Sequence, residues 1–219
     1  MEKEMKEYLL PGKYIDSDHP SVIKFAHQNA SHTRDEVKKA VALYGAVRDG
    51  FRYDPYHIDL TEEGMKANNL LTRISGYCVE KANLLAAAAR VVGIPSRLGF
   101  ANVRNHIGTD KFAEILKTDI LVFHGYTELF LLGKWVKATP AFNRELCHKL
   151  QVAPLEFDGL NHSIFQEYNH AGHQYMEYLK DYGQFSDLPR DLFIKELRKH
   201  YGHLFINNQL GEKGVKVHW

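Results

Sequence analysis

The chain has 219 residues, which is enough for one hydrophobic core and is close to the upper end of what a single domain uses. Hydrophobic residues make up 44% and charged residues 25% of it, and these proportions exclude a disordered or fibrous chain. Its 28 Lys and Arg nearly balance its 27 Asp and Glu, for a formal charge of +1, so the composition does not indicate a nucleic-acid partner. We expect a single domain over residues 1–219.

The N-terminal segment MEKEMKEYLLPGKY is charged and lacks the apolar run of a signal peptide, and no stretch of about 18 apolar residues follows it. Only two cysteines occur, Cys78 and Cys147, in a chain that is large enough to fold without disulfides. These observations predict a cytoplasmic protein with no membrane partner. Each thiol then needs its own explanation.

Two segments in the first half have the pattern of helices. Residues 31–50 carry apolar side chains largely at helical spacing, with Ser31 or Thr33 as the expected N-cap. Residues 76–93 place several apolar side chains on one face and end at Gly93. We predict that the second helix is buried along that face.

Strands are predicted after this helix, because residues 96–103 and 119–140 are rich in β-branched and aromatic side chains. Residues 132–134 separate two such runs as a hairpin turn would. A last helix is expected over residues 191–201. The order of two helices, antiparallel strands and a helix indicates an α+β fold.

Cys78 falls in the opening turn of the second helix. Unpaired backbone N–H groups and the positive end of the helix dipole favour a thiolate there. The same N–H groups can bind the oxyanion that forms when a thiolate attacks a carbonyl, and Gly76 would allow a substrate backbone to approach. Cys78 is therefore a candidate nucleophile, although most cysteines in such positions are small core residues.

The sequences GYC at residues 76–78 and GIPSR at residues 93–97 resemble the core motif of the transglutaminase-like superfamily. The resemblance covers roughly residues 50–143. It implies a papain-like α+β core, in which a central buried helix packs on an antiparallel sheet, with extra helices at both ends. It also implies a histidine on a neighbouring strand, which matches His124, before a Gly-x-Trp hairpin, which matches residues 133–135.

From this resemblance we expect a thiol enzyme in which Cys78 forms a thioester with a peptide, protein or other amide substrate. His124 would act as the base, with a ring nitrogen roughly 4 Å from the sulfur, and would return the proton to the leaving amine. Proteolysis, deamidation, de-N-glycosylation and amine crosslinking all fit, and we favour hydrolysis because water needs no second binding site. No cofactor or metal is implied. A hydrogen-bonded core histidine is the alternative for His124.

The third catalytic residue departs from the family pattern. The family usually has an Asp four residues after the Trp, whereas this chain has Thr139 there. A threonine hydroxyl can accept a hydrogen bond from the imidazole N–H, but it cannot stabilise an imidazolium by charge. We expect Thr139 beside His124, with its side chain toward the ring nitrogen that does not face Cys78. Asn143 and Asp158 are the other candidates for this role.

Four further residues are assigned with alternatives open. Tyr53 and Tyr77 could donate a hydroxyl to an oxyanion, line an acyl pocket or only pack. Glu128 is on the same strand as His124 but roughly 13 Å along it, so we expect a solvated or cross-strand charge. Cys147 has no motif around it and is expected to be a core or surface thiol.

Two other classes of function remain as hypotheses. The thirteen histidines, with His170 and His173 close together, suggest a metal-binding protein, although their spacings match no common ligand pattern. The missing Asp suggests instead a domain that keeps the fold for binding alone. Fast alkylation of Cys78 would favour the enzyme, and zinc release to a chelator would favour the metal-binding protein.

Overall fold

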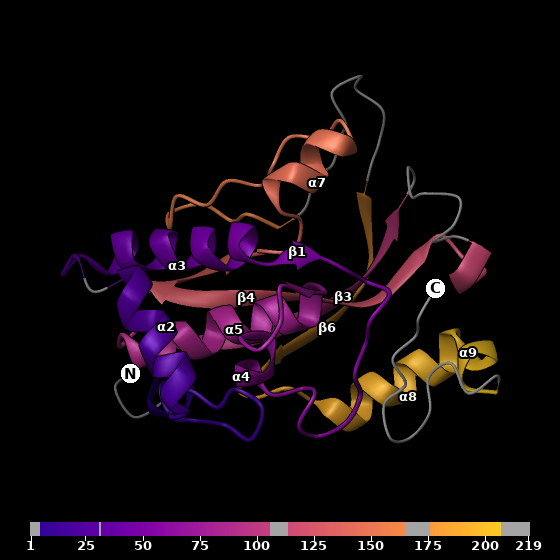
Figure 1. Cartoon of the computed structure of the whole chain (residues 1–219), viewed down its shortest axis with the longest axis horizontal. Coiled ribbons are helices and arrows are strands. Elements are labelled where there is room, and N and C mark those ends of the chain that lie inside the picture. The colour runs from indigo at the N-terminus through magenta and orange to yellow at the C-terminus, as the bar shows by residue number, and fades with distance from the viewer. Residues whose placement is uncertain (1–4, 31, 106–113, 165–175, 207–219) are drawn as a thin grey trace.

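The computed structural model describes residues 5–30, 32–105, 114–164 and 176–206. It has the predicted α+β fold, in which one long helix lies against a sheet (Figure 1). The helices are η1 (Lys6–Tyr8), α2 (Pro20–Ala30), α3 (Glu36–Gly50), α4 (Ala67–Leu70), α5 (Cys78–Val91), α7 (Arg144–Lys149), α8 (Arg190–His200) and α9 (Gly202–Ile206). The strands are β1 (Arg52–Tyr53), β2 (Ser75–Gly76), β3 (Ser96–Asn105), β4 (Ile120–Leu131), β5 (Lys134–Ala138) and β6 (Met176–Phe185).

The main sheet has the strand order β5-β4-β3-β6, and every neighbouring pair is antiparallel. The predicted hairpin joins β4 to β5, where Leu131 pairs with Lys134 across a two-residue turn. The turn residues Leu132 and Gly133 have φ angles of 49° and 82°, as a tight hairpin of this kind requires. The antiparallel sheet and the hairpin at Gly133 are therefore confirmed.

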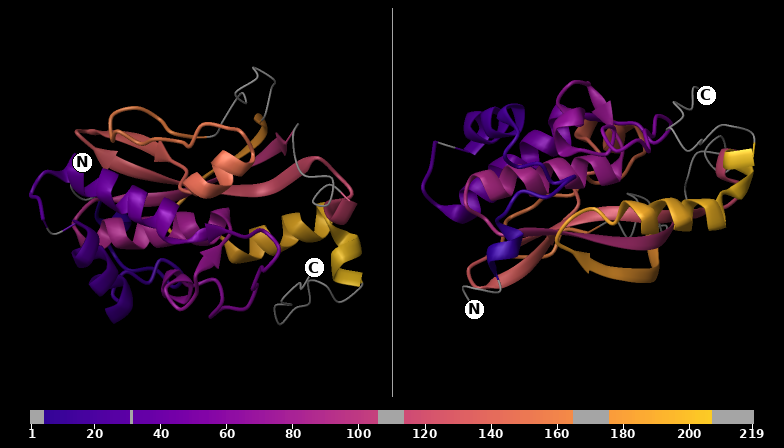
Figure 2. Two further views of the ribbon diagram at one scale, coloured as in Figure 1. Left: turned by 45° about the horizontal axis from the view of Figure 1, so that its top comes forward. Right: turned by 90° about the horizontal axis from the view of Figure 1, so that it is seen from below.

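Helix α5 is buried on all sides rather than along one face. It packs on β3 and β4, while α2, α3 and α4 cover the side away from the sheet (Figure 2). Every residue from Cys78 to Arg90 is buried, including charged and amide side chains. The run of alanines at residues 86–89 explains this burial, because small side chains let neighbouring elements approach on every side.

Several boundaries and elements differ from the expectation. Helix α3 begins at Glu36, and its N-cap is Asp35, whose carboxylate accepts hydrogen bonds from the N–H groups of Val37 and Lys38, rather than Ser31 or Thr33. Strand β6 was not predicted, because MEYLKDYGQF alternates poorly and forms a largely solvent-facing sheet edge. The last predicted helix is present as α8. Within the described residues, no helix combines the length and apolarity that a bilayer span needs.

Lys81 connects α5 to two other segments of the chain. Its ammonium is fully buried and donates to the carbonyl oxygens of Arg48, Phe51 and Ala141, at 2.8, 2.7 and 2.7 Å. Burial lowers the pKa of Lys81 to about 7. The three bonds tie the end of α3 and the segment after β5 to the first turns of α5.

We expect Lys81→Met to lower the free energy of unfolding by about 3 kcal/mol, because three buried carbonyls lose their donor. Lys149→Met is the matched control, since Lys149 is exposed and forms an exposed ion pair with Glu145. The control should change the free energy by no more than about 0.5 kcal/mol. Urea unfolding at pH 7 measures both, and equal stabilities would show that Lys81 does not hold these segments.

Candidate active site

Cys78 is the first residue of α5, as predicted, and Tyr77 is its N-cap. The Tyr77 N–H donates to the Glu80 carboxylate at 3.1 Å, and Glu80 is also paired with Arg73. Gly76 has a different role from the one expected. An added Cβ there would lie 2.6 Å from a Leu70 methyl group, so Gly76 allows packing inside the protein and not the approach of a substrate.

His124 follows a bulge in β4. Two residues, Val122 and Phe123, stand opposite Asn102 alone, and Phe123 has a φ angle of 61°, which is strained for a bulky residue. At the bulge, side chains accept the hydrogen bonds that β3 would otherwise accept from the backbone of β4. The Phe123 N–H donates to the Asn102 amide oxygen at 3.0 Å, and the Val122 N–H donates to the Tyr201 hydroxyl at 2.8 Å. The bulge sets the direction in which His124 leaves the strand.

Strand β4 touches the first turn of α5 next to His124. A Cβ added at Gly125 would lie 3.0 Å from the Val79 Cα atom and 3.3 Å from a Val79 methyl group, so only glycine fits without a shift. The Gly125 N–H also acts to lower the pKa of Cys78. This close contact brings the histidine strand to the helix that carries the cysteine.

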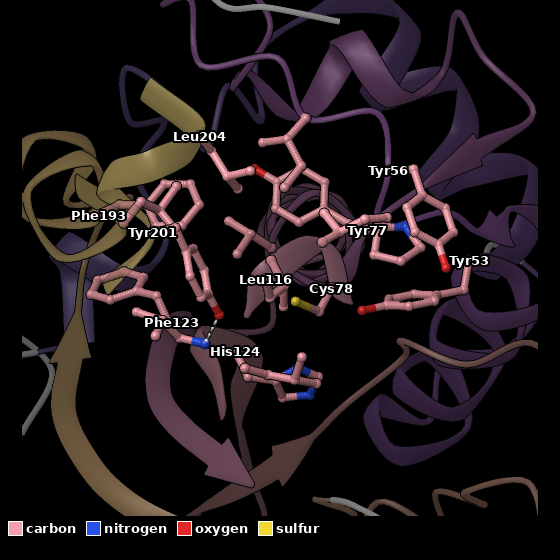
Figure 3. Close-up of a pocket in the computed structure, with 17 residues that line it drawn as sticks. Tyr53, Tyr56, Tyr77, Cys78, Leu116, Phe123, His124, Phe193, Tyr201 and Leu204 are labelled. Carbon is pink, nitrogen blue, oxygen red and sulfur yellow. Dashed lines mark hydrogen bonds between the residues drawn. The ribbon is translucent and has the colours of Figure 1, made fainter. Parts of the chain in front are cut away.

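Cys78 and His124 line the same pocket, which has a volume of about 70 Å³ (Figure 3). The hydroxyl of Tyr53 is directed toward the Cys78 sulfur, whereas the hydroxyl of Tyr77 is directed toward Leu204. Tyr53 is thus the better placed of the two tyrosines for contact with a reacting group. The expected separation of roughly 4 Å between sulfur and imidazole stays a prediction.

Thr139 meets His124 in a second, smaller cavity of about 10 Å³. The Thr139 hydroxyl and the His124 Nδ1 atom are both buried, and neither has a hydrogen-bond partner among the described residues. The Thr139 backbone is fixed, because its N–H donates to Ser163 at 2.9 Å and its carbonyl accepts from Tyr44 at 3.1 Å. The structure brings Thr139 and His124 to one cavity without a direct hydrogen bond, and the orienting role of Thr139 stays a prediction.

Asn143 and Asp158, the other candidates for the third catalytic residue, have structural hydrogen bonds of their own. The Asn143 amide oxygen accepts a hydrogen bond from the Tyr53 N–H at 3.0 Å, which ties α7 to β1. Asp158 is exposed and closes a turn, in which the N–H groups of Leu160 and Asn161 hold its pKa at about 2. Among the described residues, neither borders the cavity that Thr139 shares with His124.

Glu128 and Cys147 are structural. Glu128 is buried and pairs across the sheet with Arg97 at 2.6 Å and Lys137 at 4.0 Å, so the cross-strand alternative applies and the solvated one does not. Cys147 is fully buried in α7. The described residues contain no group of three or more His, Cys, Asp and Glu that could hold a metal, and His170 and His173 lie outside them.

The thiol and the imidazole are neutral at pH 7. Burial raises the pKa of Cys78 to about 11, although the N–H groups of Gly125 and Val79 and the Tyr53 hydroxyl act to lower it. Burial also lowers the pKa of His124 to about 4. The expectation that the helix terminus favours a thiolate is therefore wrong for the free protein, because desolvation outweighs the N–H groups.

This neutral pair predicts the pH dependence of alkylation. The thiolate is the reactive form, and at a pKa of about 11 its fraction rises with pH throughout the neutral range. The rate constant for Cys78 with iodoacetamide should rise about tenfold per unit between pH 6 and pH 9. Quantification of the Cys78 peptide by mass spectrometry measures this rate separately from Cys147. A plateau at acidic pH would instead indicate a preformed thiolate–imidazolium pair.

A family model described as "Transglutaminase-like superfamily" matches residues 23–140. Among solved structures, "a putative cysteine protease" from Cytophaga hutchinsonii shares 17% identity at a TM-score of 0.49, over 83% of this chain and 54% of its own. "A putative protease" from Parabacteroides distasonis shares 19% at a TM-score of 0.39, over 54% of this chain and 23% of its own. No curated protein matches.

The present chain thus spans about half the length of the first of these structures. The family match begins within α2 and ends directly after Thr139, so it includes α5, β4 and β5. It covers more than half of the 219 residues. This chain belongs to the transglutaminase-like superfamily.

Proposed function

We propose that the protein is a cysteine hydrolase that forms a thioester between Cys78 and the acyl group of an amide or peptide substrate, with His124 as the base. The observation that carries the proposal is the shared pocket. The thiol at the first turn of α5 and the imidazole from β4 both line this pocket. Gly125 allows the close contact between the two elements.

The reaction begins from the neutral pair. As the Cys78 sulfur attacks the carbonyl carbon, the thiol proton passes to His124, whose low pKa leaves its ring free to accept it. The C–N bond then breaks, and the imidazolium gives that proton to the leaving amine. Water attacks the thioester, His124 takes its proton, and cleavage of the C–S bond releases the acid and restores the thiol.

The oxyanion of each tetrahedral intermediate needs donors close to the sulfur. The N–H groups of Val79 and Gly125 and the Tyr53 hydroxyl all act to lower the pKa of Cys78, so they favour negative charge at this place. Donors arranged in this way can stabilise the negative charge as it moves from sulfur to oxygen. Tyr53 is the side chain that we assign to this contact.

Acylation by p-nitrophenyl acetate tests the proposal with a small, activated acyl group. Wild-type protein should release p-nitrophenolate and carry the acetyl group on Cys78, as seen by peptide mass spectrometry. Cys78→Ala should abolish the adduct, and His124→Gln should slow its formation by about 10²- to 10⁴-fold, because proton transfer is lost. Cys147→Ala is the matched cysteine control and should keep the wild-type rate.

A wild-type protein in which Cys78 reacts no faster than Cys147 would contradict the enzyme assignment. The same result would support the alternative in which the fold serves binding alone. Equal rates for wild type and His124→Gln would instead retain Cys78 as the nucleophile and remove His124 as its base.

The role proposed for Thr139 predicts opposite effects of two substitutions. Thr139→Asp adds a carboxylate whose oxygens extend one bond further into the cavity that holds His124 Nδ1. It should raise the His124 pKa and increase the acylation rate by about tenfold, since one pKa unit corresponds to that factor. Thr139→Val, of similar shape, should lower the rate by removing the hydroxyl. Unchanged acylation in both variants would show that Thr139 is only a structural residue.

A further inference from the structure

The pocket beside Cys78 is almost wholly apolar. Apart from Cys78 and His124, its described lining consists of aliphatic and aromatic side chains and contains no Asp, Glu, Lys or Arg. These residues are Tyr53, Pro55, Tyr56, Ile58, Tyr77, Val79, Ile115, Leu116, Leu121, Val122, Phe123, Phe193, Leu197, Tyr201 and Leu204. The described walls therefore offer no counter-charge to a bound group.

The hydroxyl groups of Tyr77 and Tyr201 do not make the pocket suitable for a charged group. The Tyr201 hydroxyl is already used by the backbone of β4, where it donates to Ile120 at 2.7 Å and accepts from Val122 at 2.8 Å. The Tyr77 hydroxyl is buried and has no hydrogen-bond partner in the part of the chain that the structure describes, so it can serve one oxygen or nitrogen atom of a ligand but cannot neutralise a charge. Its ring lies almost parallel to that of Phe193, with centroids 6.5 Å apart.

We propose that this pocket binds an uncharged, apolar side group of the acyl donor, aliphatic or aromatic, next to the carbonyl that Cys78 attacks. This inference rests on the proposed function. A carboxylate or ammonium group would lose its hydration there without a partner, at a cost of several kcal/mol, whereas an apolar group gains from burial. The volume of about 70 Å³ is several times what one water molecule needs, so a group of several heavy atoms fits.

Two activated esters provide a matched pair of probes. They are p-nitrophenyl butyrate and p-nitrophenyl 3-sulfopropanoate, whose acyl groups share a two-carbon spacer and differ in a terminal methyl against a terminal sulfonate, an anion too weakly nucleophilic to attack its own ester. In either case the Cys78 sulfur bonds to the carbonyl carbon, the C–O bond breaks, p-nitrophenolate leaves, and the thiol proton passes through His124 to water. The rate of each ester is divided by its rate with free N-acetylcysteine, which removes differences in intrinsic reactivity.

We expect the corrected acylation rate of Cys78 to be at least about tenfold higher for the butyrate ester than for the sulfonate ester, because only the sulfonate loses the hydration of a charge in the pocket. Equal rates, or faster acylation by the sulfonate ester, would overturn the apolar pocket and leave the thiol enzyme intact. If neither these esters nor p-nitrophenyl acetate acylated Cys78, the proposed function itself would fail, so the two failures are distinguishable.

A charged residue introduced into the pocket lining tests whether the side group of the acyl donor binds in this pocket. Leu116 is buried in the pocket lining, and Leu116→Lys should reduce the butyrate-to-sulfonate ratio by at least about tenfold, since the ammonium supplies the missing counter-charge. Leu160→Lys is the matched control, because Leu160 is 45% exposed and does not line the pocket. An unchanged ratio in a folded Leu116→Lys protein would place the side group elsewhere. If that variant does not fold, the wild-type ratio still decides the proposal.

Discussion

The complete burial of α5 is the constraint on which the rest of the structure depends. A helix without a solvent-facing side must satisfy each of its polar side chains from inside the protein. Lys81 does so with three backbone carbonyls, and Asn83 donates to the carbonyls of Tyr14 and Met65. Arg90 likewise donates to the carbonyls of Leu10, Ser96 and Ser186. These bonds fix segments that are far apart in sequence around the helix that carries Cys78.

Burial also decides the chemistry that the helix terminus can support. The N–H groups that reach Cys78 favour an anion, but the apolar walls around the sulfur raise its pKa to about 11. The same walls lower the pKa of His124 to about 4, so its ring is unprotonated at pH 7 but is a weaker base than a solvated imidazole. In the proposed reaction, such a pair transfers its proton during attack rather than before it. The N–H groups then act on the oxyanion, where charge develops only in the presence of a substrate.

Local patterns were sufficient to predict a buried helix with Cys78 in its opening turn, the hairpin at Gly133 and the antiparallel sheet. They could not predict the bulge before His124, because it depends on Asn102 and Tyr201, whose contacts with β4 are set only by the tertiary fold. The position of Cys78 at a helix N-terminus also predicted a thiolate. The sequence shows that the helix dipole acts on the thiol, but it does not show how deeply the folded protein buries the sulfur. The meeting of Thr139 and His124 in one cavity followed from the family motif and not from any spacing.

The pocket divides into two parts of different origin in the chain. Its two proposed reacting residues, Cys78 and His124, lie within residues 23–140, which the family model covers. The wall formed by Phe193, Leu197, Tyr201 and Leu204 lies beyond them, in and around α8 and α9. Tyr201 also binds the β4 bulge, so the same C-terminal segment that shapes the pocket supports the strand that presents the histidine. The superfamily core therefore supplies the proposed reacting groups, whereas the C-terminal helices determine which side group can lie beside them.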